Sequence, residues 1–165
     1  MENQVEAGTR LRDAENELRT ARTLFAAQSW PGAVLHSQLG VEQSAKAVIA
    51  CFEDPEHDHD PSRQLFGLLS ENVSEMTQRL GEERMTRLRR LGIETNRIAR
   101  WHGIATYGDQ LPDGTRLAAV DLIDEADARW ALALAERSFA TARDFVETWR
   151  KAGEASNEGG KTDGR

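Results

Sequence analysis

The sequence predicts an all-α protein, an up-and-down bundle of four long helices and one short helix. Aromatic residues make up only 6% of the 165 residues, whereas the helix-favouring Ala, Leu, Arg and Glu are common. Apolar residues recur at spacings of three and four in every long segment. We expect one domain over residues 1–152, followed by a disordered tail over residues 153–165, which is rich in Gly, Ser and Asn.

The first two long helices are predicted over residues 2–28 and about 31–53. Pro31 ends the first pattern and suits the first turn of the second helix. Each helix has one apolar stripe, with polar and charged residues between its members. In the second helix, Glu42 and Lys46 are an i,i+4 pair, which contributes roughly a few tenths of a kcal/mol when it lies on a surface.

Residues 54–60 form a polar loop before the short helix. His57 and His59 stand at alternate positions among aspartates, a pattern compatible with a metal site and equally with a solvated loop. We assign no metal here. Asp60 suits an N-cap and Pro61 the first turn of the helix that follows. That helix carries four apolar residues: Leu65, Phe66, Leu68 and Leu69.

The third long helix is predicted over about 73–102, with a bend near Gly81 or Gly92. Gly103 is expected to stop the helical pattern, together with the glycines and proline that follow it. His102 would then lie in the last turn, at the negative end of the helix dipole. That position favours the protonated form of the imidazole.

A connection over about 103–120 separates this helix from the last one, predicted over about 121–152. Long connections of this kind within a bundle often carry function. Cys51 is the single cysteine, which excludes an internal disulfide, and its apolar helical surroundings predict a packed thiol. We expect a cytoplasmic protein with no signal peptide and no membrane-spanning helix.

Positive charge gathers in one stretch of an acidic chain. Residues 84–100 contain six arginines and one glutamate, whereas the whole chain carries a net charge of −7. The overall charge argues against general coating of nucleic acid, but such a strip can bind an anion locally. The alternative is a helix face that acidic neighbours neutralise.

Arg97 and His102 are the residues in this stretch that suit phosphodiester chemistry. An imidazole can move a proton while a guanidinium holds phosphate charge. Five residues apart on an ideal helix, the two side chains differ by about 140° in azimuth. They line one groove only if the helix ends at His102 or if a second copy supplies the other wall. The structural alternative is that Arg97 pairs with Glu94 on a solvated face.

Four segments follow one another in an order that resembles a known family. They are Ala26-Ala-Gln-Ser-Trp-Pro-Gly-Ala, Gln38-Leu-Gly-Val-Glu42-Gln-Ser-Ala-Lys46-Ala47, His59-Asp60 before a Leu-rich helix, and Thr106-Tyr107-Gly108-Asp109 before an acidic-started last helix. Over about residues 8–150 this order and spacing resemble the HEPN domain (higher eukaryote and prokaryote nucleotide-binding), an all-α bundle.

Ribonuclease members of that family share an arginine followed, after four to six residues, by a histidine. This motif falls on Arg97 and His102. The resemblance implies a homodimeric, metal-independent endoribonuclease without a cofactor, and many such proteins are toxins paired with a nucleotidyltransferase antitoxin. His102 would act as general base or acid when an RNA 2′-OH attacks the adjacent phosphate, and Arg97 would stabilise the charged phosphorane.

The resemblance also indicates which residues would hold RNA. Asn96 and Tyr107 are expected to orient the phosphate, and Arg90 and Arg100 to hold the RNA backbone. The chain departs from the family pattern at Ile98, where a polar residue is common, and at the turn that follows His102. The same family contains non-catalytic modules that bind a nucleotide or a partner protein, and this is the alternative function. A purely structural helical subunit is a third.

Overall fold

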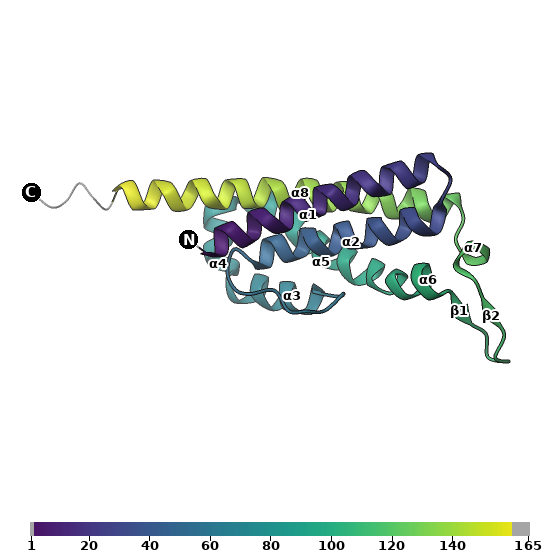
Figure 1. The fold of residues 1–165 in the computed structure, drawn as a ribbon. Helices are drawn as coiled ribbons and strands as arrows, with labels where there is room; N and C mark the ends of the chain where they lie inside the picture. Colours follow the sequence, from purple (N-terminus) through teal and green to yellow (C-terminus); the bar gives the residue numbers. More distant parts are fainter. Residues whose placement is uncertain (1, 160–165) are drawn as a thin grey trace, which may run out of the picture.

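The computed structural model describes residues 2–159, which fold into a bundle of helices with one small hairpin (Figure 1). The elements in chain order are α1 (Glu2–Ala26), α2 (Trp30–Ile49), α3 (Ser62–Glu71), α4 (Val73–Leu80), α5 (Glu82–Ala99), α6 (Trp101–Tyr107), β1 (Asp109–Gln110), β2 (Arg116–Leu117), α7 (Ala119–Leu122) and α8 (Glu125–Gly159). The prediction of an all-α bundle is confirmed.

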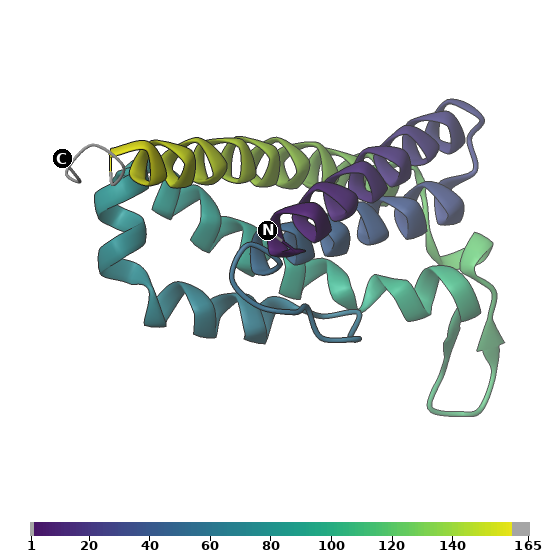
Figure 2. The same ribbon diagram turned by 60° about the vertical axis from the view of Figure 1, so that its left-hand side comes forward.

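The second helix is the centre of the bundle. It runs antiparallel to α1 and contacts α3, α5, α6 and α8 as well (Figures 1 and 2). Most of its residues are buried, in keeping with a helix that has neighbours on nearly every side. The segment that joins α2 to α3 runs back along the bundle and brings its last residues to the contact between α2 and α6 (Figure 1).

The apolar core has two parts, one at each end of the bundle. One joins the C-terminal end of α2 to α3, α4, α5 and α8, and its largest fully buried side chains are Ile49, Leu65, Met76, Met85, Leu88, Leu91 and Phe145. The other joins α1, α2 and α8 to the end of α5, and includes Leu18, Val34, Val41, Ile98 and Leu134. The polar site described below lies on α2 alongside these two parts of the core.

The predicted helix over 73–102 is three helices. Gly81 adopts φ +80°, which separates α4 from α5, because a residue with a side chain rarely takes that conformation. Gly92 is not a bend: it lies inside α5, against the ring of Phe66. Gly103 does not stop the helix either, since α6 continues to Tyr107. His102 is therefore the second residue of α6 and not part of a last turn.

The predicted loop over 103–120 is mostly ordered structure. It holds the rest of α6, the β1–β2 hairpin and the single-turn helix α7. Gly108, at φ +73°, ends α6 at the point where the chain turns into β1. The hairpin projects away from the bundle (Figure 2).

The last helix is longer than predicted. Helix α8 ends at Gly159, so residues 153–159 of the predicted tail are helical, and residues 160–165 lie outside the described part. This stretch contains one glycine before its end, at a cost of about 1 kcal/mol, and no proline. Helices α1 and α2 end slightly earlier than predicted.

The structure also bears on two other features of the sequence, the apolarity of its helices and the packing of Cys51. Among residues 2–159, none of the helices combines the length and apolarity needed to cross a membrane. Cys51 packs against the core, and burial raises the pKa of its thiol to about 12, so the thiol stays protonated.

We expect alanine substitutions at the two glycines near the end of α6 to have opposite effects on stability. In Gly108→Ala the new Cβ would overlap the carbonyl oxygen of Leu117 and keep a positive φ, at a cost of about 1–3 kcal/mol. Gly103→Ala meets nothing within 4 Å on a helix and should stabilise by about 0.5–1 kcal/mol. Urea unfolding of both variants measures the difference; equal effects would contradict this account of where α6 ends.

Candidate functional site

Three polar side chains, one turn apart, form a buried row on α2. Gln38, Glu42 and Lys46 are 1%, 3% and 6% exposed. Lys46 Nζ lies 2.8 Å from Glu42 Oε1, and Gln38 Nε2 donates to Glu42 Oε2 at 3.2 Å. The prediction of a surface pair for Glu42 and Lys46 is therefore wrong. Neighbouring elements cover both charges, and each needs the other.

The imidazole of His102 forms a hydrogen bond with Gln38, the first residue of this row. Its Nδ1 lies 3.0 Å from Gln38 Oε1. Because a carboxylate can only accept, Gln38 turns its NH₂ to Glu42 and its oxygen to His102. Nδ1 of His102 must therefore carry the proton, which leaves Nε2 with a free lone pair in the neutral ring.

His59 completes the cluster from the loop between α2 and α3. Its Nδ1 lies 3.0 Å from Glu42 Oε2, and its ring stacks on that of His102, with centroids 4.0 Å apart and planes at 18°. Asn96 of α5 anchors this part of the loop by donating to Asp60 Oδ2 at 3.1 Å. The side chain of His59 is 62% exposed, so a ligand can reach the stacked pair from the loop side.

The charge state of His102 differs from the sequence-based expectation. Burial lowers the pKa of His102, and a positive charge on His59 lowers it further, against the smaller opposing effect of Glu42. A helix C-terminus would have raised it, but His102 lies near the start of α6. The ring is therefore neutral at pH 7, as a general base must be.

Arg97 lies on a different face, in an open hollow of about 540 Å³. The hollow is lined by Asn96, Arg97, Arg100, Trp101, Asp127 and Trp130. Arg97 forms no ion pair with the side chains that the structure describes. The predicted alternative, a pair with Glu94, is wrong because Glu94 accepts from Arg90 at 3.2 Å and from Arg137 at 3.1 Å.

The structure does not bring Arg97 and His102 together within one chain. The helix is nearly continuous through Arg100, which keeps helical dihedrals, so Arg97 faces α8 and solvent while His102 faces α2. Arg100 and Asn96 share the hollow with Arg97. Tyr107 lies at the far end of α6 and is 70% exposed. Arg90, committed to Glu94, lines a separate hollow.

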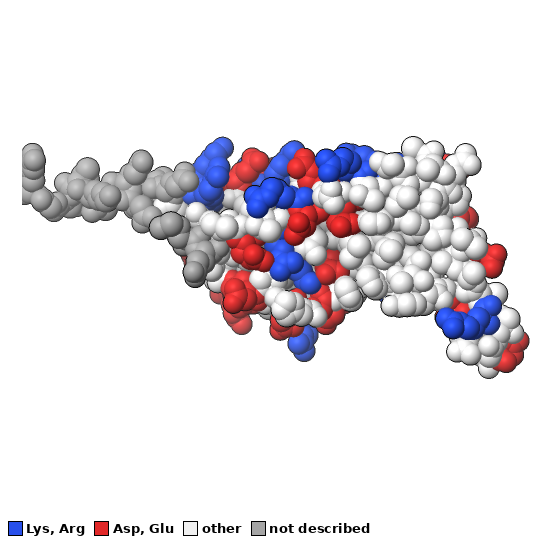
Figure 3. Space-filling view, viewed as in Figure 1, with Lys and Arg blue, Asp and Glu red and all other residues white. Residues whose placement is uncertain are grey.

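Charge is distributed unevenly over the face that carries α1, α2 and α6. The end of α1, the start of α2 and the whole of α6 display almost no charged side chains, whereas both signs gather over the other half (Figure 3). The helix that carries His102 therefore borders an uncharged area. A protein surface can cover such an area without burying unpaired charge.

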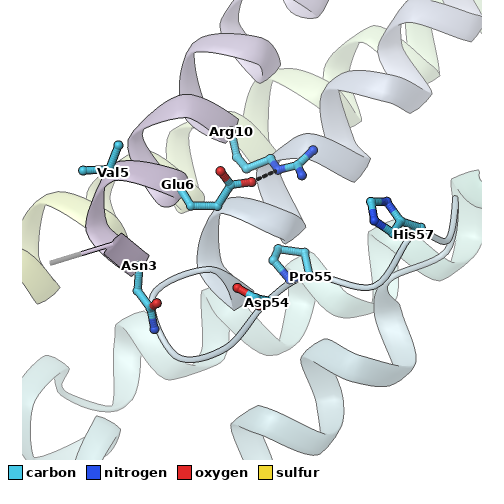
Figure 4. A pocket seen from close by; sticks show the side chains of 7 residues that line it. All are labelled: Asn3, Val5, Glu6, Arg10, Asp54, Pro55 and His57. Atoms are coloured by element: carbon cyan, nitrogen blue, oxygen red, sulfur yellow. Dashed lines mark hydrogen bonds and ion pairs between the residues drawn. The ribbon is translucent and has the colours of Figure 1, made fainter.

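A larger hollow lies elsewhere, and its side chains leave less charge for a ligand. It measures about 770 Å³ and lies between the start of α1 and the loop after α2, where Figure 4 shows its lining: Asn3, Val5, Glu6, Arg10, Asp54, Pro55 and His57. Arg10 is committed to Glu6 at 2.8 Å and to Gln43 at 3.1 Å, which leaves little positive charge for a ligand. Among the described residues, no group of three or more metal-ligating side chains forms, around His57 or elsewhere.

The sequence-based reasoning missed the buried row on α2 and the role of His59. The available signal was the spacing itself, since Gln38, Glu42 and Lys46 stand at i, i+4 and i+8 on one face of a largely apolar helix. Polar residues on one face of a buried helix need partners from other segments. The sequence alone did not show that His59 and His102 are those partners.

Removal of the Glu42 carboxylate should be costly, because it leaves the Lys46 ammonium buried without its partner. We expect Glu42→Ala to lower the free energy of unfolding by about 3–5 kcal/mol. The matched control is Glu125→Ala, which breaks an exposed i,i+4 pair with Arg129 and should cost less than about 1 kcal/mol. Similar losses in the two variants would contradict the buried character of the row.

The lowered pKa of His102 predicts a pH effect on stability. Below about pH 6.5 the unfolded chain takes up a proton at this position more readily than the folded protein does. The stability contributed by the neutral ring is therefore complete above that pH, and it is lost as the pH falls toward the lowered folded-state pKa. Subtraction of the profile of His102→Gln from that of the wild type isolates this slope; a slope of opposite sign would refute it.

The family comparison agrees with this architecture. The family model described as the HEPN domain matches residues 7–151, which is most of the chain. No curated protein and no solved structure matches it. The match includes every element of the bundle, the buried row on α2, both histidines of the stacked pair and Arg97. The chain belongs to the HEPN domain family.

Proposed function

We propose that this protein is a cytoplasmic, metal-independent endoribonuclease that acts as a homodimer. The reaction is attack of an RNA 2′-OH on the adjacent phosphate. In this proposal the protein is the toxin of a pair whose antitoxin is a nucleotidyltransferase, as in many members of the family. The observation that carries the proposal is the state of His102, a neutral imidazole whose Nδ1–H is tied to Gln38.

His102 has the properties that a general base requires. Its ring orientation is set by a hydrogen bond to a buried side chain, which is itself held by a carboxylate. The lone pair on Nε2 is free to take the proton of a 2′-OH.

Arg97 supplies the positive charge in this proposal, but from a second copy of the chain. Within one chain it lies beside Arg100 in the hollow near Trp101, on the opposite side of the helix from His102. Two copies related by a twofold axis place each copy's Arg97 opposite the other's His102 if the α5–α6 segments face one another. The guanidinium then stabilises the phosphorane.

The surface around α6 supports a homodimer. The uncharged area over α6 and the start of α2 can be covered at little electrostatic cost (Figure 3). Tyr107, 70% exposed at the end of α6, is a contact available to a second copy. Trp101 and Ile104, also on α6, pack partly against the core of their own chain.

A second candidate function rests on the hollow alone. Arginine and tryptophan side chains together suit a nucleotide, since guanidinium groups bind phosphate and aromatic rings stack on bases. A non-catalytic module would use Arg97 as an anion contact and His102 only to close the polar row on α2. Nucleotide binding without RNA cleavage would favour this function.

The catalytic proposal predicts that Arg97→Ala and His102→Ala each lower RNA cleavage by about 10²–10⁴-fold while the fold persists. Cleavage should resist EDTA, yield a 2′,3′-cyclic phosphate, and stop when the scissile nucleotide lacks its 2′-OH. Arg12→Ala, an exposed arginine on α1, is the matched control and should keep full activity. Absence of cleavage by the purified wild type, including after its separation from any co-expressed partner, would refute the ribonuclease.

A mixture of the two inactive variants tests the shared site. A mixed dimer holds one complete site, with Arg97 from the His102→Ala chain and His102 from the Arg97→Ala chain. After exchange of subunits we expect about a quarter of the wild-type rate, because half of the dimers are mixed. An inactive mixture would place both residues of a working site in one chain. Light scattering of a monomer at tens of micromolar would contradict the dimer.

A further inference from the structure

The stacked imidazole rings of His59 and His102 are oriented in the same way relative to α2. Each ring has its Nδ1 on an acceptor of α2, Gln38 for His102 and Glu42 for His59. Neither Nε2 has a partner among the described residues. Because the rings are nearly parallel at 4.0 Å and both Nδ1 atoms point to the same row, the two Nε2 atoms face away from α2 together.

The surroundings of the two rings differ in charge. His59 faces the carboxylate of Glu42, whereas His102 faces the neutral amide oxygen of Gln38. The other charged groups near the pair are Lys46, whose ammonium is paired with Glu42, and Asp60, which Asn96 holds. A positive charge on His59 would lower the pKa of His102, so the two rings oppose each other's positive charge. Of the two rings, only His59 has its Nδ1 on a carboxylate, the partner that best balances a positive charge.

We propose that His59 is a second catalytic residue, the general acid that protonates the leaving 5′-oxygen while His102 acts as the general base. This inference rests on the proposed ribonuclease function. Two adjacent titratable groups whose environments favour different protonation states are the arrangement that acid–base catalysis needs. His59 is the more exposed ring and can reach a substrate.

The step balances without a metal or another reactant. Nε2 of neutral His102 takes the proton of the 2′-OH as its oxygen forms a bond to phosphorus. The bond from phosphorus to O5′ breaks, and O5′ takes the proton from Nε2 of protonated His59. The products are a 2′,3′-cyclic phosphate and a 5′-OH end. The two rings have then exchanged charge states, and proton exchange with water restores them.

A purely structural role for His59 makes a different prediction. As a side chain that stacks on His102 and satisfies Glu42, it would affect every substrate alike. As an acid, it matters only when the leaving group needs a proton. An ester of uridine 3′-phosphate with 4-nitrophenol separates the two roles, because nitrophenolate leaves without protonation.

The experiment compares an oligoribonucleotide with this ester for the wild type, His59→Ala and His102→Ala, each as the full chain. We expect His59→Ala to lower RNA cleavage by about 10²–10⁴-fold but to cleave the ester at nearly the wild-type rate. His102→Ala should lose both activities. His57→Ala, two residues away in the same loop and exposed, is the matched control and should keep both.

Four results would overturn the inference in distinguishable ways. Equal losses by His59→Ala on the two substrates would assign it a structural role, and no loss on either would remove it from the site. A wild type inert on both substrates would refute the ribonuclease itself, and the acid with it.

NMR titration of the imidazoles adds a readout independent of activity. The pKa of His102 should rise in His59→Ala, and an unchanged value would refute the contact between the two rings on which the inference rests.

Discussion

The buried carboxylate of Glu42 is the group on which the candidate site depends. A charge this enclosed on the central helix costs several kcal/mol unless its oxygens are fully paired. Lys46, Gln38 and His59 supply the partners. Since Gln38 gives its NH₂ to the carboxylate, its oxygen is left for His102, which determines the tautomer of that ring. A requirement for charge compensation in the core thus determines which nitrogen of His102 is left without a partner in the bundle.

The sequence predicted the helices because their apolar period is a local property. The errors lie where conformation depends on contacts distant in sequence. The sequence does not distinguish the glycines that end a helix from the one that continues it. Gly81 and Gly108 take a positive φ and end helices, whereas Gly103 lies within α6. Likewise, nothing in the local sequence shows that the i,i+4 pair of Glu42 and Lys46 is buried. It becomes buried only when α5, α6 and the loop with His59 cover that face of α2.

The Arg97–His102 motif shows how far helix geometry limits one chain. The continuation of α6 past Gly103 prevents the imidazole from swinging back toward the arginine, so the two side chains stay on opposite sides. The spacing in the sequence predicted the motif, but it did not show that Arg97 and His102 lie on different faces of the helix. The inward face is occupied by the row on α2, and the outward face is open. In the proposed homodimer, a second copy would supply the arginine without any strain in the helix.

The basic strip divides in the folded chain. Arg84 and Arg87 share the carboxylate of Asp144 of α8, and Arg90 shares Glu94 with Arg137, so the first part of α5 is only partly neutralised. Arg97 and Arg100 form no ion pair among the described side chains, and the guanidinium of Arg100 lies over the ring of Trp101, at 5.8 Å. These two positive charges lie at the α5–α6 end of the strip. An anion bound between them would lie beside the helix that carries His102.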